Sequence, residues 1–137
     1  NYDSDAFFAI WEVNHDPDAA EHALSFAMEA SEVVAQVAPS LDLRTPDDEP
    51  IRMAWGVTLG PAAVSALAGG QLAVLGDATN VAWKLSAVAG REGRAPVTVS
   101  SPIEEALRDR FEFSEPEDLM IKGRLGSERI FGALGRR

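Results

Sequence analysis

The sequence predicts an α+β fold, a ferredoxin-like βαβ sandwich with helices packed on a mostly antiparallel sheet. Patterns typical of helices and strands alternate along the chain, and short glycine-rich turns join several neighbouring strand patterns. The chain has 137 residues, of which 46% are hydrophobic and 25% are charged. This length and balance indicate one globular domain over residues 1–137.

The N-terminal part predicts a strand followed by a helix. The continuous apolar run Ala6–Trp11 is typical of a strand covered on both faces. Asp16 and Pro17 then signal a helix start, with Asp16 as the N-cap and Pro17 as the first helical residue. From there to about Ala38, apolar residues recur at helical spacing and form a stripe: Ala23, Phe26, Ala30, Val33 and Val37.

The middle of the chain predicts a loop and a hairpin. Residues 40–50 are polar, acidic and proline-bearing, so we expect a surface loop. Apolar residues alternate over 51–57, which predicts a strand. Residues 62–67 fit either a strand or the start of a helix. A turn at Gly69-Gly70 and a returning strand at 71–75 follow.

A second long helix is predicted after Gly76, with Asp77 as its N-cap and an apolar stripe at Val81, Leu85 and Val88. The remaining patterns predict short elements, namely strands over 97–99, 111–113, 119–121 and 129–134 and a helix over 102–107.

Charge and composition exclude several kinds of partner. The chain has 12 Lys and Arg against 22 Asp and Glu, which gives a formal net charge of −10. We therefore expect neither duplex nucleic acid nor anionic membrane as a partner. The absence of cysteine excludes disulfides, thiolate metal sites and cysteine nucleophiles. No run approaches the ~18 apolar residues that span a bilayer, and no basic segment of the signal-peptide type opens the sequence, so we expect a cytoplasmic setting.

Isolated polar residues offer few candidate sites. His15 and His22 lie near the predicted helix start, where exposed histidines are more often solvated than bound to metal. Trp11, Trp55 and Trp83 are expected to anchor the core or an interface. Several carboxylates form no defined pair and predict a solvated acidic face: Glu104, Glu105, Glu112, Glu115, Glu117 and Asp118.

The most informative segment is the strand, turn and helix over 73–85. Asn80 and Lys84 are four residues apart, so they share one helix face near the helix N-terminus. An amide beside a cation there could hold a sugar hydroxyl and a phosphate. A capped amphipathic helix with a polar outer face explains the same residues without any ligand.

This segment resembles a known family signature. Gly76–Leu85 (GDATNVAWKL) is similar to the G-D-T-V-N-x-A-x-R-L motif of class III adenylate and guanylate cyclases. Residues 51–61 (IRMAWGVTLGP) resemble the strand of that family that ends in G-I-x-x-G-P, and residues 4–11 (SDAFFAIW) resemble its G-D-A-F-L-A-V-F strand. Residues 121–123 and 129–131 resemble its two closing strands, so the likeness covers nearly the whole chain in order.

The resemblance implies a reaction and a set of site residues. These enzymes convert ATP or GTP into a 3′,5′-cyclic nucleotide and pyrophosphate, using two Mg²⁺ or Mn²⁺ ions held by two aspartates at the interface of a head-to-tail dimer. On the family pattern, Asp5 matches the second metal aspartate, Asn80 the residue that orients the ribose, and Lys84 the arginine that neutralises the phosphate. Lys122 matches a lysine that binds the triphosphate.

Several of these positions depart from the family pattern. Lys84 lacks the guanidinium fork of the arginine that it replaces. Asn1 and Ala73 stand at the two positions that select the purine, and alanine cannot hydrogen-bond a base through its side chain. The first metal aspartate has no counterpart, and we expect the domain to lack the first strand and helices of the family.

Two functions follow from this mixture of matches and departures. The sequence predicts a divergent cyclase homology domain, weakly active or inactive, that acts as a nucleotide-binding and dimerising signalling module. The alternative is an active adenylate or guanylate cyclase. A missing first strand would leave a sheet edge and apolar surface uncovered, so we expect a homodimer.

Overall fold

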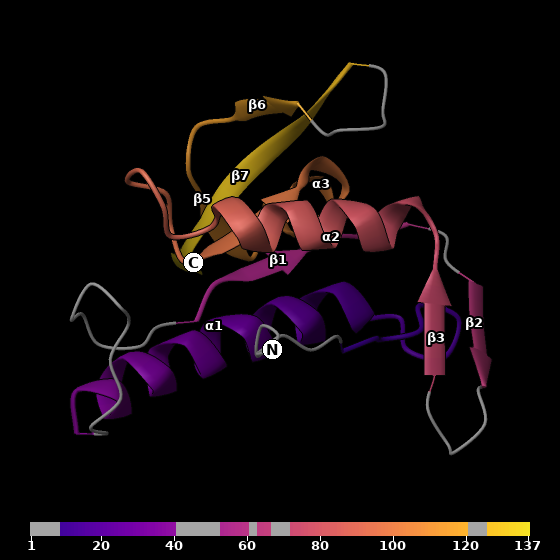
Figure 1. Ribbon diagram of the computed structural model, residues 1–137, viewed down its shortest axis with the longest axis horizontal. Helices are drawn as coiled ribbons and strands as arrows, with labels where there is room; N and C mark the ends of the chain where they lie inside the picture. Colours follow the sequence, from indigo (N-terminus) through magenta and orange to yellow (C-terminus); the bar gives the residue numbers. More distant parts are fainter. Residues whose placement is uncertain (1–8, 41–52, 61–62, 67–71, 121–125) are drawn as a thin grey trace, which may run out of the picture.

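The computed structural model of the chain describes residues 9–40, 53–60, 63–66, 72–120 and 126–137 (Figure 1). The elements are, in order, α1 (Ala19–Val37), a 3-10 turn (Ala38–Ser40), β1 (Trp55–Val57), β2 (Ala63–Ala66), β3 (Leu72–Leu75), α2 (Asp77–Val88), β4 (Val97–Ser100), α3 (Ser101–Leu107), β5 (Phe111–Phe113), β6 (Glu117–Met120) and β7 (Ser127–Arg136).

The main sheet is built around β7, the longest strand that the structure describes. Its strand order is β1-β4-β7-β5, and β6 also pairs with β7. Only the β1–β4 pair is parallel, and the pairs that β7 makes with β4, β5 and β6 are antiparallel. Strands β2 and β3 form a separate antiparallel hairpin beside the start of α2 (Figure 1). The predicted α+β fold with a mostly antiparallel sheet is therefore confirmed.

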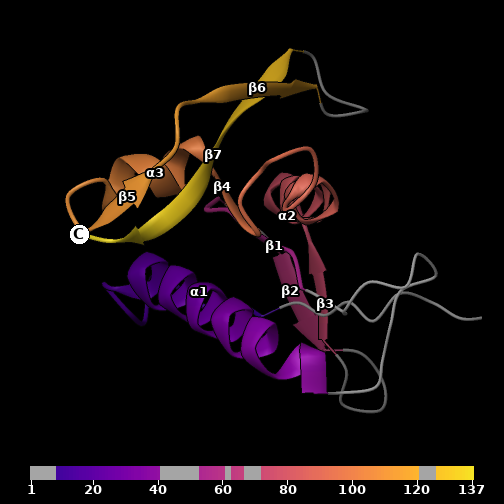
Figure 2. The same cartoon turned by 90° about the vertical axis from the view of Figure 1, so that its left-hand side faces the viewer.

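Helices cover both faces of the sheet (Figure 2). On one face, α1 and α3 pack on β1, β4, β5 and β7 around a buried cluster: Leu24, Ala27, Val57, Val97, Val99, Ile103, Leu107, Phe111 and Ala133. On the other face, α2 contributes Val81 and Leu85 to a smaller cluster with Ile130 of β7. The two clusters hold α2 on the opposite side of the sheet from α1.

Helix α2 approaches the sheet most closely at Gly56 of β1. A Cβ added there would meet the backbone carbonyl oxygen of Ala82, and it would lie 2.6 Å from Leu85 Cβ and 2.7 Å from Ser86 N. The buried Thr98 on the neighbouring strand β4 donates a hydrogen bond from Oγ1 to the Leu85 carbonyl at 3.1 Å. Glycine at 56 therefore makes room for the helix backbone, and Thr98 ties that backbone to β4.

The predicted helix over 17–38 exists, but its start and its buried face differ from the prediction. The helix begins at Ala19, so the N-cap is Asp18 rather than Asp16, and Asp18 makes no side-chain cap hydrogen bond. Asp16 nevertheless accepts a hydrogen bond at Oδ1 from the Asp18 backbone N–H at 3.0 Å, a capping contact made just before the helix. Phe26, Val33 and Val37 of the predicted stripe are exposed. The core is met instead by a face of mostly small residues, which lets the helix lie close to the sheet: Ala19, Ala20, Ala23, Leu24, Ala27 and Met28.

The predicted strand over Ala6–Trp11 is wrong over the part that the structure describes, since residues 9–12 form neither strand nor helix. Trp11 nevertheless packs on α1, because its ring lies 5.6 Å from that of Phe26. Phe26 in turn meets Trp55 of β1 edge to face, with ring centroids 5.5 Å apart. Over the described residues 9–12, the aromatic ring of Trp11 therefore makes a helix contact rather than a strand contact.

The other predictions hold with small shifts. Residues 63–66 form a strand, which settles the choice left open for 62–67, and the N-cap of α2 is Gly76 rather than Asp77. Strands β4 to β7 and helix α3 lie within a few residues of their predicted positions. The predicted loop over 40–50 lies outside the described residues except for Ser40, which ends the 3-10 turn, and the Gly69-Gly70 turn also lies outside them.

Replacing Gly56 by alanine should weaken the packing of α2 against β1. The added Cβ would collide mainly with backbone, which cannot rotate away, so we expect Gly56→Ala to lower the free energy of unfolding by about 1–3 kcal/mol. Gly135→Ala is the matched control, because no atom lies within 4 Å of a Cβ built there. Urea denaturation of both variants checks the prediction, and equal stabilities would contradict it.

Candidate functional site

A turn at Gly76 sets the direction in which α2 leaves β3. Gly76 has φ of 152°, a value that residues with a Cβ rarely adopt, and it caps the helix. The backbone N–H groups of Thr79 and Asn80 both donate to the Gly76 carbonyl, at 3.2 and 3.4 Å. Asp77 places a carboxylate in the first turn, where the helix dipole favours negative charge.

The candidate site is the outward face of α2. Asn80 and Lys84 are both exposed and lie one helical turn apart, as their spacing predicts. The next residues along the chain, Val81 and Leu85, are buried against the sheet. Trp83 is also exposed and precedes Lys84. An amide, a cation and an indole on one exposed helix surface can together contact the sugar, phosphate and base of a nucleotide.

The structure tests only some of the predicted site residues. Ala73 lies in β3, three residues before Gly76, where it pairs with Ser65 of β2. Asn1, Asp5 and Lys122 lie outside the described residues, so their assignments stay predictions. The structure thus brings Asn80 and Lys84 onto one surface and places Ala73 on the strand that leads into it.

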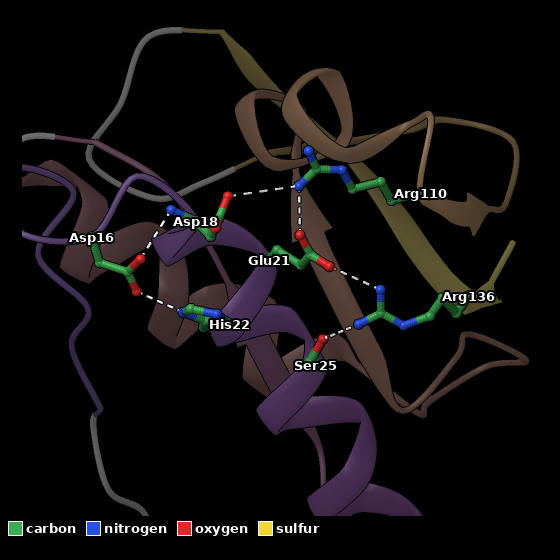
Figure 3. A network of polar contacts seen from close by, with 7 residues as sticks. All are labelled: Asp16, Asp18, Glu21, His22, Ser25, Arg110 and Arg136. Carbon is green, nitrogen blue, oxygen red and sulfur yellow. Dashed lines mark hydrogen bonds and ion pairs between the residues drawn. The ribbon is translucent and has the colours of Figure 1, made fainter.

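Within the described residues, one group of three or more metal-ligand side chains comes together. It consists of Asp16, Asp18 and His22 at the start of α1, with potential ligand atoms within 4.8 Å of one another (Figure 3). The Nδ1 of His22 lies 2.6 Å from Oδ2 of Asp16, so these two atoms already satisfy each other. An imidazole with two carboxylates also suits a transition metal better than Mg²⁺, which prefers oxygen ligands. This group therefore does not fit the pair of Mg²⁺ ions that the family resemblance implies.

The same end of α1 carries a network that fixes the helix to β5 and β7 (Figure 3). Glu21 accepts hydrogen bonds from Arg136 at 2.9 Å and from Arg110 at 2.5 Å, and Arg136 also donates to Ser25 at 2.6 Å. The hydrogen bond from Arg136 is the largest cause that lowers the pKa of Glu21. This network stabilises the fold, and sequence patterns miss it because 89 and 115 positions separate Glu21 from its two arginines.

The two histidines belong to separate contacts, so no two-histidine site forms. His15 Nδ1 lies 3.3 Å from Glu12 Oε2, and His22 pairs with Asp16. The hydrogen bond to Asp16 is the largest cause that raises the pKa of His22 and likewise lowers the pKa of Asp16. Both histidines are exposed, as the sequence predicted.

The architecture is similar to that of solved guanylyl and adenylate/guanylate cyclase domains. The guanylyl cyclase domain of the RhoGC fusion protein from Blastocladiella emersonii, described as a dimer, matches with a TM-score of 0.60 at 22% identity, over 88% of this chain and 61% of its own. The guanylate cyclase domain of RhGC from Catenaria anguillulae, solved with GTP, matches with a TM-score of 0.57 at 20% identity, over 88% and 62%. An adenylate/guanylate cyclase/hydrolase from Silicibacter pomeroyi matches with a TM-score of 0.60 at 23% identity, over 85% and 62%.

These similarities establish the fold of the chain. They extend over only part of each solved structure. The chain spans 61–62% of the length of these solved structures. No protein-family model matches the sequence, and no curated protein matches it either. Among the described helices, none combines the length and apolarity needed to cross a bilayer.

The His22–Asp16 contact predicts a pH-dependent part of stability. Because the pKa of His22 is raised in the folded chain, the protonated imidazole stabilises the fold below 6.5, its ordinary value, and that contribution is lost as pH rises through the folded pKa. We expect an NMR titration of His22 to have its midpoint above 6.5. Asp16→Asn should return the midpoint toward the ordinary value, and an unchanged midpoint in that variant would contradict the assignment.

Proposed function

We propose that the chain is a divergent class III nucleotide cyclase homology domain that binds a nucleoside triphosphate and dimerises as part of cytoplasmic signalling, with weak or no cyclase activity. The observation that carries the proposal is the exposed pair Asn80 and Lys84 on α2, in a chain with the cyclase fold. The GTP complex of the Catenaria domain supports a guanine or adenine nucleoside triphosphate as the ligand class.

The roles of the two side chains follow from their chemistry. The ammonium group of Lys84 can pair with a phosphate oxygen, and its exposure allows the long side chain to reach the ligand from the helix surface. The amide of Asn80, one turn earlier, can donate to a sugar oxygen and accept from a sugar hydroxyl. Their spacing matches a ligand that carries a ribose next to its phosphates.

Weak turnover follows from what these residues lack. A lysine offers one point charge where a guanidinium would grip two phosphate oxygens in the transition state. Losing one such preorganised contact typically slows the reaction about 100-fold or more. Ala73 can offer no side-chain hydrogen bond to a purine, which removes a means of choosing between ATP and GTP. Asp5 remains the proposed metal ligand, for Mg²⁺ or Mn²⁺, and Asn1 and Lys122 remain proposed substrate contacts.

Nucleotide binding and turnover can be measured separately. With Mn²⁺ present, we expect the chain to bind ATP or GTP in calorimetry. Lys84→Ala should weaken that binding about tenfold, because a charge-assisted hydrogen bond to phosphate is lost. Arg91→Ala, an exposed cation in the loop after α2, is the matched control and should leave affinity unchanged.

The cyclase assay decides between the two functions. We expect little or no cyclic nucleotide above that of an Asp5→Ala variant. Clear formation above that level would identify the chain as an active adenylate or guanylate cyclase instead. A wild-type chain that binds neither nucleotide would contradict the proposal as a whole.

The dimer part of the proposal rests on the apolar side chains that α1 leaves exposed. Phe26, Val33 and Val37 are 40%, 56% and 43% exposed, and the last two lie one turn apart on the same helix. Apolar surface grouped in this way on one element is typical of an interface. The Blastocladiella domain, which shares the fold, is described as dimeric. A second copy of the chain is therefore the proposed partner of this surface.

Light scattering at micromolar concentration tests the dimer. We expect a dimer for the wild-type chain and a monomer for Val33→Glu with Val37→Glu, because a charge buried in an apolar interface is costly. Met120→Glu is the control, since Met120 is also exposed, at 70%, but lies on β6. A monomeric wild-type chain, or equal dissociation by the β6 variant, would contradict the assignment of α1.

A further inference from the structure

An ion pair joins the loop after α2 to the start of β6. Arg94 donates from Nε to Glu117 Oε1 at 2.9 Å and from Nη2 to Glu117 Oε2 at 2.6 Å, so the two groups meet through a pair of parallel hydrogen bonds. The Arg94 side chain is only 19% exposed. The hydrogen bond between them is the largest cause that raises the pKa of Arg94 and lowers the pKa of Glu117.

This contact adds to the sequence prediction for Glu117. The carboxylate is exposed, as a solvated acidic face requires, at 45%, and it is also bound by an arginine 23 positions earlier. The loop that carries the arginine is itself compact, since Gly90 N–H donates to the Ala95 carbonyl at 2.8 Å and Arg94 N–H donates to the Arg91 carbonyl at 3.0 Å. The guanidinium is therefore presented from a fixed loop rather than from a loose one.

A second contact joins the same strand to α2. Leu119, two residues after Glu117, lies on the same side of β6. Leu119 packs against the cluster of Val81, Leu85 and Ile130, so the β6–β7 pair of strands contacts the inner face of α2. Apolar contact thus holds the sheet-facing side of α2, and the ion pair ties the loop that follows α2 to β6.

These two contacts together affect the direction in which the exposed side chains of α2 project. Val81 immediately follows Asn80, and Leu85 immediately follows Lys84. Successive residues of a helix are about 100° apart around its axis, so the way the buried pair is seated sets the direction in which the exposed pair projects. A shift of β6 that loosens Leu119 would let α2 roll and would redirect both exposed side chains.

We infer that Arg94 and Glu117 are positioning residues for the nucleotide-binding face of α2: their ion pair holds β6 against the helix and so fixes where Asn80 and Lys84 point. The inference rests on the proposed function, because it names what positions that same face. Neither residue is placed in contact with the nucleotide, and their effect on binding passes through Asn80 and Lys84.

A double-mutant cycle with Lys84 tests this dependence. Using Mn²⁺ with ATP or GTP as the ligand, we expect Arg94→Ala to weaken binding about fivefold in the wild-type background and to cause a clearly smaller loss in the Lys84→Ala background, where only Asn80 remains to be misplaced. Reversing the pair, with Arg94→Glu and Glu117→Arg together, should recover most of the affinity. Arg129→Ala is the matched control, because it removes an exposed ion pair between β7 and β6, in which Arg129 Nε lies 3.5 Å from Asp118 Oδ1.

Equal losses in both backgrounds would overturn the positioning role, since a contact that acts only on overall stability would weaken binding whether or not Lys84 is present. Glu117→Gln, which keeps the shape of the side chain, should show a smaller loss of the same kind. It also keeps the test valid if Arg94→Ala does not fold.

A measurement without nucleotide separates this inference from the proposed function. In Arg94→Ala we expect hydrogen exchange to quicken about tenfold at the amides of residues 117–120, and the NMR signals of Asn80 and Lys84 to move. Arg129→Ala should change neither α2 signal. If the wild-type chain binds no nucleotide, the proposed function fails, and these two readouts still decide whether the pair holds α2. Unchanged exchange and unchanged α2 signals would overturn the inference.

Discussion

The close packing of α2 on the sheet at Gly56 is the contact on which the candidate site depends. No side chain at this position could fit beneath the backbone of the helix, because Ala82, Leu85 and Ser86 already occupy the space. With the helix this near, the hydroxyl of Thr98 reaches the Leu85 carbonyl, and Val81 and Leu85 become fully enclosed. The exposed positions of Asn80 and Lys84 follow from this arrangement, since each lies about 100° around the helix axis from the buried residue that follows it.

Arginine–carboxylate contacts, together with the apolar clusters, join segments that are distant in the sequence. The chain is strongly acidic, and at two places arginines bind a carboxylate from a distant segment, Arg94 with Glu117 and both Arg110 and Arg136 with Glu21. Arg136 also lies over the ring of Phe111, 4.6 Å from its centroid, which adds a cation–π contact to the same junction. The cation of Lys84 lies elsewhere, on the exposed surface of helix α2. In a chain with a net charge of −10, such a cation is the natural point of attachment for an anionic ligand.

Local patterns predicted most of the elements, and they failed where distant segments decide the outcome. The stripe of Val81, Leu85 and Val88 identified α2 and its buried side, because that helix has a single apolar face. Helix α1 carries bulky apolar residues on one side and mainly alanines on another, and only the sheet beneath it determines which side is buried. The run that ends at Trp11 has the composition of a strand, yet its tryptophan packs on Phe26. Asn80 and Lys84 could be paired from their spacing, whereas Glu117 could not be matched with Arg94, since spacing rules do not reach across 23 positions.

Strand β7 has a consequence for how the chain is made. It pairs with β4, β5 and β6, and it contributes Ile130 to one buried cluster and Ala133 to the other. During synthesis, the ribosome releases residues 127–136 after all three of those partner strands. Helices and the β2–β3 hairpin can form as they emerge, but the main sheet must wait for its central member. Until then the nascent chain exposes unpaired strand edges. Such edges can pair with other chains and aggregate, so we expect chaperones to protect the chain at this stage.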